Sequence, residues 1–299
     1  MALGAVLQAL FSDAAPDRRV RLQDLVQRYL IDGRGPGRLG AHDLLARTPG
    51  DFAWMLRGRR RFQRDWFAEV DAVVAERRAA SPSTGDLLDG LLAARDADTG
   101  EPLAAQEVRS QVATFIVAGF ETTARLLFWA AYLLAFDAAE QDRVHAELDS
   151  ASGDGARSPR LRCVLQETLR LYPAAPVITR LALADDVVAG ERVRAGERVM
   201  ISPWLVHRHR HLWDDPAAFR PERFEGRPNA FLTDDAFIPF SKGPRVCIGA
   251  SFAMVEAAVV FGVVLRRFRL LPADGPPAMP VAVVSIRPDR PFAFRLVKR

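Results

Sequence analysis

Hydrophobic and polar residues along the first half of the chain alternate with a helical period. Apolar side chains recur every three or four positions, in segments that end near glycine, serine or proline. The segment 105–136 contains no proline and is strongly apolar in its second half, so we expect it to be a central, buried helix. The same period predicts further helices over residues 3–11, 20–30, 54–79, 86–94, 138–149 and 160–171.

The pattern changes after Pro173. Short alternating runs separated by turn residues predict strands, and a proline-rich stretch over 203–246 predicts irregular structure. The expected strands are 178–183, 191–193, 198–201, 281–286 and 291–297, with one further helix over 250–267. We expect a mainly α protein with a small antiparallel β-sheet. Because no linker or internal repeat divides the chain, we expect one domain over 1–299.

Composition narrows the possible classes of function. The chain has 299 residues, of which 49% are hydrophobic, which excludes a disordered chain. No uninterrupted apolar run reaches the roughly 18 residues needed to cross a bilayer, so we expect no membrane association. Two cysteines cannot form a disulfide framework, which favours the cytoplasm. The net charge of +4 is small and dispersed, so we expect no binding to nucleic acid.

Chemistry is indicated first by a cysteine between two glycines. Cys247 follows Gly243 and Arg245, precedes Gly249, and lies directly before the predicted helix 250–267. Backbone N–H groups and the positive end of that helix would stabilise a thiolate there. The glycines would let the backbone turn tightly and approach a flat ligand, while Arg245 could reach an anionic group on it. A buried structural cysteine is the alternative for any single cysteine.

Five fixed positions, one of them the cysteine itself, argue against the structural alternative. They form the pattern F-x-x-G-x-R-x-C-x-G from Phe240 to Gly249, which resembles the haem-binding loop of cytochromes P-450. The resemblance implies that the cofactor is haem b and that Cys247 is its metal ligand. It also implies that Phe240, Arg245 and Gly249 contact the cofactor. A thiolate ligand on haem iron favours cleavage of the O–O bond.

A second motif lies in the middle of segment 105–136. Gly119, Glu121 and Thr122 belong to the run A-G-F-E-T-T, where an acid beside a hydroxyl is costly in a buried helix unless it has a function. A helix-internal polar patch is the alternative. The run resembles the oxygen-activation motif of the same family. The resemblance implies that Thr122 hydrogen-bonds dioxygen, that Glu121 supplies protons through water, and that Gly119 leaves space beside the haem.

A third pattern pairs two short motifs. Glu167 and Arg170 have the spacing of an ion pair on one helix face, which alone would indicate only a solvated surface pair. With Arg223 of the downstream P-E-R-F run, they resemble the family's buried network that holds the segment before the cysteine loop. Arg180 matches a family position that contacts a haem propionate. The motifs also occur in the family's order.

Three histidines at alternate positions, His207, His209 and His211, could bind a metal on one face of a strand. A surface segment rich in histidine and arginine is the preferred interpretation, because no cysteine or carboxylate follows at ligand spacing.

The family usually has an N-terminal block before the helices seen here, with sheet strands and a W-x-x-x-R haem clamp. This sequence shows no such clamp, since Arg57 follows Trp54 at the wrong spacing. We expect an N-terminally truncated member. Three explanations stay open: a misassigned start, a fragment, and a compact form completed by a partner.

The sequence thus predicts a monooxygenase that inserts one oxygen atom from O2 into an apolar organic substrate. Electrons would come ultimately from NAD(P)H through a separate ferredoxin or flavodoxin, docking near Lys242 and Arg143. A catalytically impaired haem-binding or partner-binding scaffold is the alternative function. The resemblance also suggests that five small apolar residues line the substrate pocket: Val117, Ala118, Ala175, Val177 and Val284.

Overall fold

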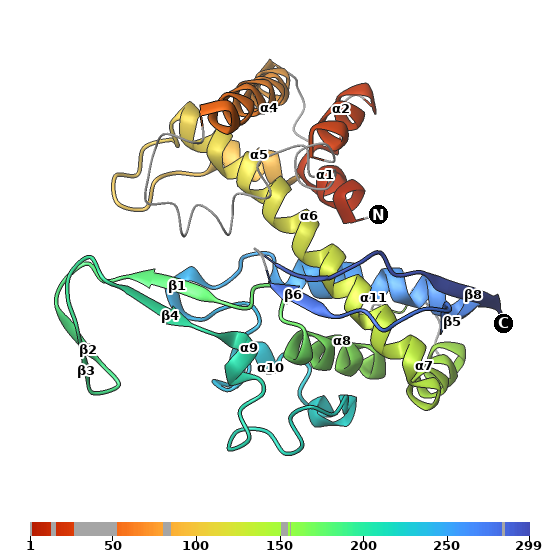
Figure 1. The fold of residues 1–299 in the computed structure, drawn as a ribbon. Helices are drawn as coiled ribbons and strands as arrows, with labels where there is room; N and C mark the ends of the chain where they lie inside the picture. Colours follow the sequence, from red (N-terminus) through yellow and green to blue (C-terminus); the bar gives the residue numbers. More distant parts are fainter. Residues whose placement is uncertain are drawn as a thin grey trace. The chain divides into compact units, whose positions relative to one another are not determined.

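A computed structural model describes residues 2–12, 16–26, 53–79, 85–150, 155, 157–282 and 285–299, without the side chains of residues 53–62. The described chain is mainly helical, with small antiparallel ladders (Figure 1). Its principal helices are α1 (Ala2–Leu10), α2 (Pro16–Val26), α4 (Ala53–Ala79), α5 (Leu87–Ala93), α6 (Ala105–Phe136), α7 (Ala138–Ser150), α8 (Pro159–Leu171) and α11 (Ala250–Arg267). The short helical turns are α9 (Pro203–Val206), η4 (Pro221–Phe224), α10 (Ala230–Thr233) and η5 (Gly243–Arg245).

The strands form antiparallel pairs, each a two-stranded ladder. β1 (Ile178–Leu181) pairs with β4 (Arg198–Ile201), and β2 (Asp186–Val188) pairs with β3 (Glu191–Val193). β5 (Phe268–Pro272) pairs with β8 (Phe294–Lys298), and β6 (Pro280–Ala282) pairs with β7 (Ile286–Pro288). The expected mainly α fold with minor antiparallel β structure is confirmed, although the β structure is divided among separate ladders.

Residue contacts divide the chain into two compact units, Met1–Glu121 and Thr122–Arg299, and the division falls within α6. The expectation of one domain over 1–299 therefore stays a prediction. In the first unit, apolar faces of α1, α2, α4, α5 and the start of α6 form one core. Its fully buried members include Leu7, Leu10, Phe11, Val70 and Ile116.

A buried ion pair ties α4 to α5 within the first unit. Arg77 Nη1 lies 2.7 Å from Asp86 Oδ1, and both side chains are almost inaccessible to solvent. Asp86 also caps α5 by accepting from the N–H of Leu88 and Asp89, and it accepts from Ser12 after α1. Burial opposes ionisation, but these hydrogen bonds outweigh it and hold the pKa of Asp86 well below its usual value.

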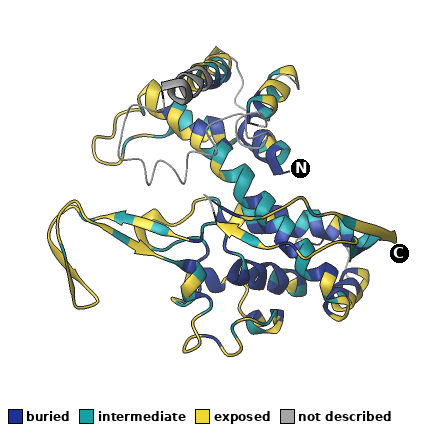
Figure 2. Ribbon diagram, viewed as in Figure 1, coloured by how far each residue is buried: buried dark blue, intermediate teal, exposed yellow. Residues whose placement is uncertain are grey.

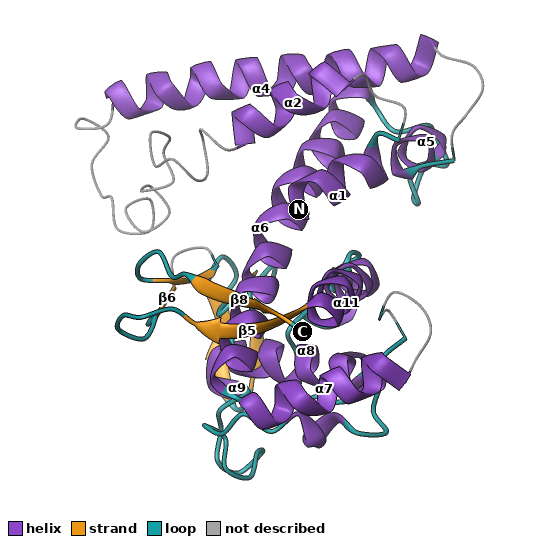
Figure 3. Cartoon of the chain, turned by 90° about the vertical axis from the view of Figure 1, so that its right-hand side faces the viewer, coloured by secondary structure: helices purple, strands orange, loops and turns teal. Residues whose placement is uncertain are grey.

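The second unit is built around α8. Every residue from Cys163 to Leu171 in this helix is buried, as the dark blue helix in Figure 2 shows. α7 and α11 pack against it together with the segment around η4, and β5 continues directly from the end of α11 (Figure 3). Ser158 begins α8 as its N-cap, accepting from the N–H of Leu161, with Pro159 at the first turn.

The sequence predicted the long helices closely and the β structure less well. The bounds 105–136, 250–267, 191–193 and 198–201 agree with the structure. The prediction missed β2 and β5, and the expected strand 281–286 is wrong as one element, because β6 ends at Ala282 and β7 begins at Ile286. β5 pairs with β8 across more than twenty residues of sequence, which local patterns do not record. The expected helix 20–30 begins earlier, at Pro16, and its residues 27–30 lie outside the described residues.

Within the described chain, α6 is the one helix that is long and apolar enough to cross a membrane. Length and apolar composition alone do not distinguish a membrane span from a helix in the core of a folded protein, so they are weak evidence for a membrane span.

Candidate functional site

The loop before α11 presents the thiol of Cys247 to solvent. Its backbone N–H donates to the carbonyl of Phe240 at 2.9 Å, which closes the loop on itself. Gly243 has φ +75° at the start of η5, a backbone conformation that favours glycine. The loop thus holds an exposed cysteine next to the first turn of α11. The sequence predicted its place before this helix but not its exposure.

Apolar side chains surround this cysteine in the sequence and are themselves exposed. Val246, Ile248 and Phe252 are 45%, 83% and 42% exposed, although large apolar side chains are normally buried. The ring of Phe240 packs edge-on against Phe231 at 5.0 Å and is half-buried behind the loop. An exposed thiol flanked by exposed apolar groups fits a flat, apolar ligand with a metal centre.

Two arginines lie where they could bind anionic groups of such a ligand. Arg245 ends η5, is exposed, and makes no ion pair with any residue in the described part of the chain. Arg180, in β1, donates from Nη2 to Ser241 Oγ at 2.9 Å and thereby connects this strand to the cysteine loop. Ser241 was not among the predicted site residues, although it lies next to Phe240 in the loop motif.

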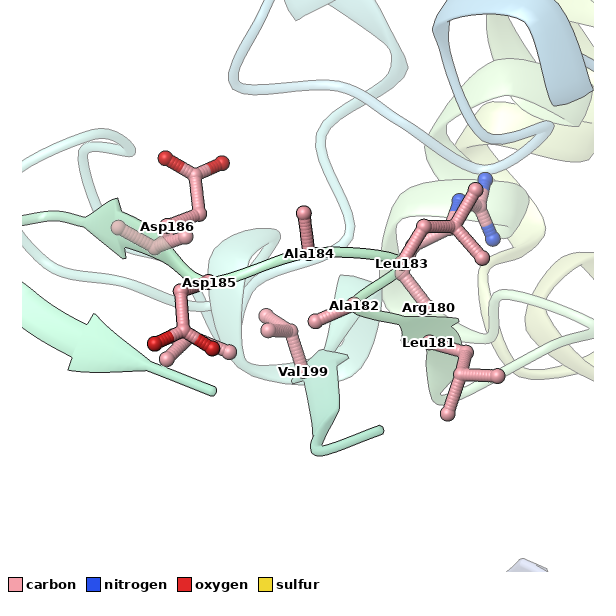
Figure 4. Close-up of a pocket in the computed structure, with 10 residues that line it drawn as sticks. Arg180, Leu181, Ala182, Leu183, Ala184, Asp185, Asp186 and Val199 are labelled. Atoms are coloured by element: carbon pink, nitrogen blue, oxygen red, sulfur yellow. The ribbon is translucent and has the colours of Figure 1, made fainter. Parts of the chain in front are cut away.

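Arg180 also borders an open pocket on the ladder. The pocket has a volume of about 440 Å³ and is lined by residues 180–186 with Val188, Val193 and Val199. Figure 4 shows the guanidinium of Arg180 directed away from Asp185 and Asp186. Apart from Arg180, the pocket contains no predicted site residue.

The middle of α6 carries the second motif. Glu121 and Thr122 are half-buried, and Thr123 is buried. A Cβ added to Gly119 would lie 3.1 Å from Cγ2 of Val6, so the absence of a side chain at position 119 lets α1 approach α6 closely. The structure thus gives Gly119 a packing role that the sequence analysis did not anticipate.

The third motif is a buried charge network. Arg170 binds both carboxylate oxygens of Glu167, at 2.7 and 2.8 Å, and neither side chain is accessible. Arg223 Nε lies 3.4 Å from Glu167 Oε1, within ion-pair range but outside hydrogen-bond geometry. Arg170 also donates to the carbonyls of His207, Pro216 and Ala218, which fixes the segment that leads to the cysteine loop.

The histidine segment differs from the sequence interpretation at one position. His209 and His211 are exposed, but His207 is completely buried and its Nε2 accepts from the N–H of Ile238 at 2.8 Å. Burial, with the nearby guanidinium groups of Arg170 and Arg208, lowers the pKa of His207 to about 3. Among the described residues, no group of three or more histidine, cysteine or acidic side chains could hold a metal ion.

The predicted wall residues are distributed over several segments. Val117 packs against the core of the first unit, and Ala118 is exposed on α6. In the second unit, Ala175 is half-buried and Val177 is exposed. Both residues lie in the segment between α8 and β1. Val284 lies outside the described residues.

Comparison with known proteins agrees with the motifs. The family model of cytochrome P-450 matches residues 41–294. Cyclooctatin synthase of Streptomyces melanosporofaciens is 32% identical over 93% of this chain and 62% of its own length. A bifunctional cytochrome P-450/NADPH–P-450 reductase of Bacillus subtilis is 36% identical over 73% of this chain and 22% of its own length.

Solved structures agree with this result. A crystal structure of a mutant haem domain of cytochrome P-450DA superposes with a TM-score of 0.82 at 27% identity, covering all of this chain and 66% of that domain. This chain therefore spans about two thirds or less of the length of these relatives. A match over most of the sequence, with the fold and the cysteine loop in agreement, shows that the chain belongs to the cytochrome P-450 family.

Proposed function

We propose that the protein is a haem-thiolate monooxygenase that inserts one oxygen atom from O2 into an apolar organic substrate. The observation that supports this most directly is the exposed Cys247 thiol, held by its closed loop at the start of α11. Bound haem supplies the activation of dioxygen.

Cys247 would supply the thiolate ligand of the haem iron. The backbone N–H groups of the first turn of α11 point toward the loop and stabilise negative charge on sulfur. Exposed Val246, Ile248 and Phe252 would be covered by the porphyrin, which removes their apolar surface from water. Arg245 and Arg180 would bind the propionates, and the hydrogen bond from Arg180 to Ser241 sets the position of the Arg180 guanidinium.

Glu121 and Thr122 deliver protons from α6. Both side chains are half-buried, so they can exchange protons with solvent through a short water chain while excluding bulk water. Val117, Ala118, Ala175, Val177 and Val284 stay the proposed substrate-binding residues, because small apolar side chains suit an apolar molecule.

Two electrons come from NAD(P)H through a separate ferredoxin- or flavodoxin-type protein in the cytoplasm. Relatives fused to a reductase support an external source of electrons. The expected docking residues, Lys242 and Arg143, already form ion pairs, with Asp235 at 2.7 Å and with Glu140 at 2.8 Å. They would therefore attract an acidic electron donor only through a local electrostatic field, and dissolved salt weakens that attraction. Reduction rates that do not change with ionic strength would argue against this docking.

The two cysteines provide a matched test of the proposal. The haem-loaded chain, reduced and exposed to carbon monoxide, should give the strongly red-shifted Soret band of a thiolate-ligated iron. Cys247→Ala should abolish that band, and Cys163→Ala, which alters the buried cysteine of α8, should retain it. Thiolate ligation that persists in the first variant overturns the proposal.

A further inference from the structure

A surface groove in the second unit lies apart from the residues proposed to bind haem. It has a volume of about 490 Å³, which is in the range of ligand clefts. Residues of α7 and α8 form one side, and the segment from Phe224 to Pro228 forms the other. Four arginines line it, Arg157, Arg160, Arg162 and Arg227, against two acidic residues, Glu147 and Glu225.

Both carboxylates in the groove are already engaged. Glu147 accepts from the backbone N–H of Arg160 and from Ser158 Oγ, and so stabilises the N-terminus of α8. Glu225 pairs with Arg160 Nη1 at 2.6 Å, and Arg160 also binds the buried Glu140. These two acidic residues therefore do not compensate the charges of Arg157 and Arg162.

The remaining acceptors at the base of the groove are also in use. Gln166 is completely buried, and its amide donates to the carbonyl of Arg227 and accepts from the N–H of Ala230. By contrast, the side chains of Arg157 and Arg162 make no hydrogen bond or ion pair with the residues that the structure describes. Arg227 makes one ion pair, with Asp234, which is not among the lining residues. The groove thus offers hydrogen-bond donors and almost no acceptors, which selects an anionic, acceptor-rich ligand.

Apolar groups separate these cations. Pro159 and Pro228 belong to the lining and are exposed, whereas Cys163 and Phe224, which also belong to it, are buried in the core. A small inorganic anion would leave this apolar surface uncovered. A peptide in which acidic and apolar side chains alternate would cover both.

We propose that this groove docks a short acidic segment of a partner protein, with carboxylates on Arg157, Arg162 and Arg227 and apolar side chains over Pro159 and Pro228. The inference does not depend on the proposed oxidation chemistry. Because the arginines are exposed or half-buried, binding weakens as ionic strength rises.

The test uses the full chain and a fluorescein-labelled hexapeptide of alternating glutamate and leucine, with binding followed by fluorescence anisotropy. Arg162→Glu and Arg227→Glu should each weaken binding by at least about tenfold. Arg192→Glu changes the net charge equally on the exposed β2–β3 ladder and should change the affinity by less than about twofold. Equal weakening in the groove and control variants would show a nonspecific charge effect and overturn the proposal.

Further measurements distinguish peptide docking from misfolding, charge repulsion and simple anion binding. Arg162→Gln removes the cation without introducing repulsion, and circular dichroism verifies that each variant is folded. A hexapeptide of alternating lysine and leucine should not bind. Inorganic phosphate at equal charge should not compete with the acidic peptide. Effective competition by phosphate would indicate a simple anion site and contradict peptide docking.

Discussion

Arg170 and Glu167 form a doubly hydrogen-bonded ion pair, at 2.7 and 2.8 Å, in which both side chains are completely buried. The remaining donors of the guanidinium bind backbone carbonyls on either side of residue 210, so one residue of α8 holds a long irregular segment in place. This segment leads to the cysteine loop. Its order therefore depends on a charge pair in the helix that forms the core of the unit.

Removing the charge from Glu167 should destabilise the fold severely. Glu167→Gln leaves the guanidinium of Arg170 buried without a counter-ion, which costs about 3–5 kcal/mol of unfolding free energy. Glu222→Gln, which breaks the exposed pair with Arg220, should cost less than about 1 kcal/mol. Urea unfolding compares the two variants. Similar losses of unfolding free energy in both variants would contradict a larger contribution from the buried pair.

The close approach of Gly155 to α11 predicts a second sensitive position. A Cβ at this residue would lie 2.6 Å from Cα of Gly262, and its φ of +88° disfavours any side chain. Gly155→Ala should therefore cost about 2–4 kcal/mol, from backbone strain and overpacking together. Gly226 has φ +70° and open space around it, so a side chain there would strain the backbone without a steric clash. Gly226→Ala should therefore cost about 1–2 kcal/mol. Equal costs in thermal unfolding would contradict the predicted steric contact.

Glu256 on α11 should make the protein less stable at higher pH. Both of its oxygens are buried without a hydrogen-bond partner among the described residues, and burial raises the pKa of Glu256 to about 7. The folded state then binds more protons than the unfolded state between pH 4.5 and pH 7. Stability is full below pH 4.5 and falls by about 3 kcal/mol as pH rises through 7.

Glu256→Gln should remove this dependence. Urea unfolding at pH 5 and pH 8 gives the slope, with Glu101→Gln at an exposed position as the control. A wild-type chain whose stability does not decrease over this interval, or a variant that keeps the same decrease, would refute the prediction.

His207 should produce the opposite dependence in acid. Its folded-state pKa of about 3 lies below the usual 6.5, mainly because of burial, so the imidazole stays neutral when the unfolded chain is protonated. The stabilisation is complete above pH 6.5 and is lost as pH falls toward 3, by about 2 kcal/mol at pH 5. His207→Gln should flatten this part of the profile, whereas His211→Gln, at an exposed site, should not. Identical profiles for both variants would argue against a buried neutral imidazole.

The proposed proton delivery makes a prediction about activity. Thr122→Val should reduce product formed per NAD(P)H consumed by about 100-fold, because proton transfer by a positioned group contributes at least that factor. Thr114→Val is the control on the same helix, where an exposed hydroxyl donates to the carbonyl of Ser110 at 2.7 Å. Product and NAD(P)H are measured together in a reconstituted system. Unchanged coupling in Thr122→Val would remove this residue from the mechanism.

The sequence alone determined the long helices and the cysteine loop. Helical periodicity is a local property, so α6 and α11 could be predicted to their terminal residues. The loop motif around Cys247 was equally local, since glycine, arginine and cysteine at fixed spacing already imply a tight turn before a helix. The spacing of Glu167 and Arg170 suggested an ion pair, but only similarity to a family suggested that this pair is buried.

Tertiary structure decided what depends on residues that are distant in sequence. The burial of His207 follows from its contact with Ile238, and the packing role of Gly119 follows from the approach of Val6. The pairing of β5 with β8 and the bond from Arg180 to Ser241 join segments separated by loops. No local pattern encodes such contacts, because the free energy that selects them comes from side chains brought together only when the chain folds.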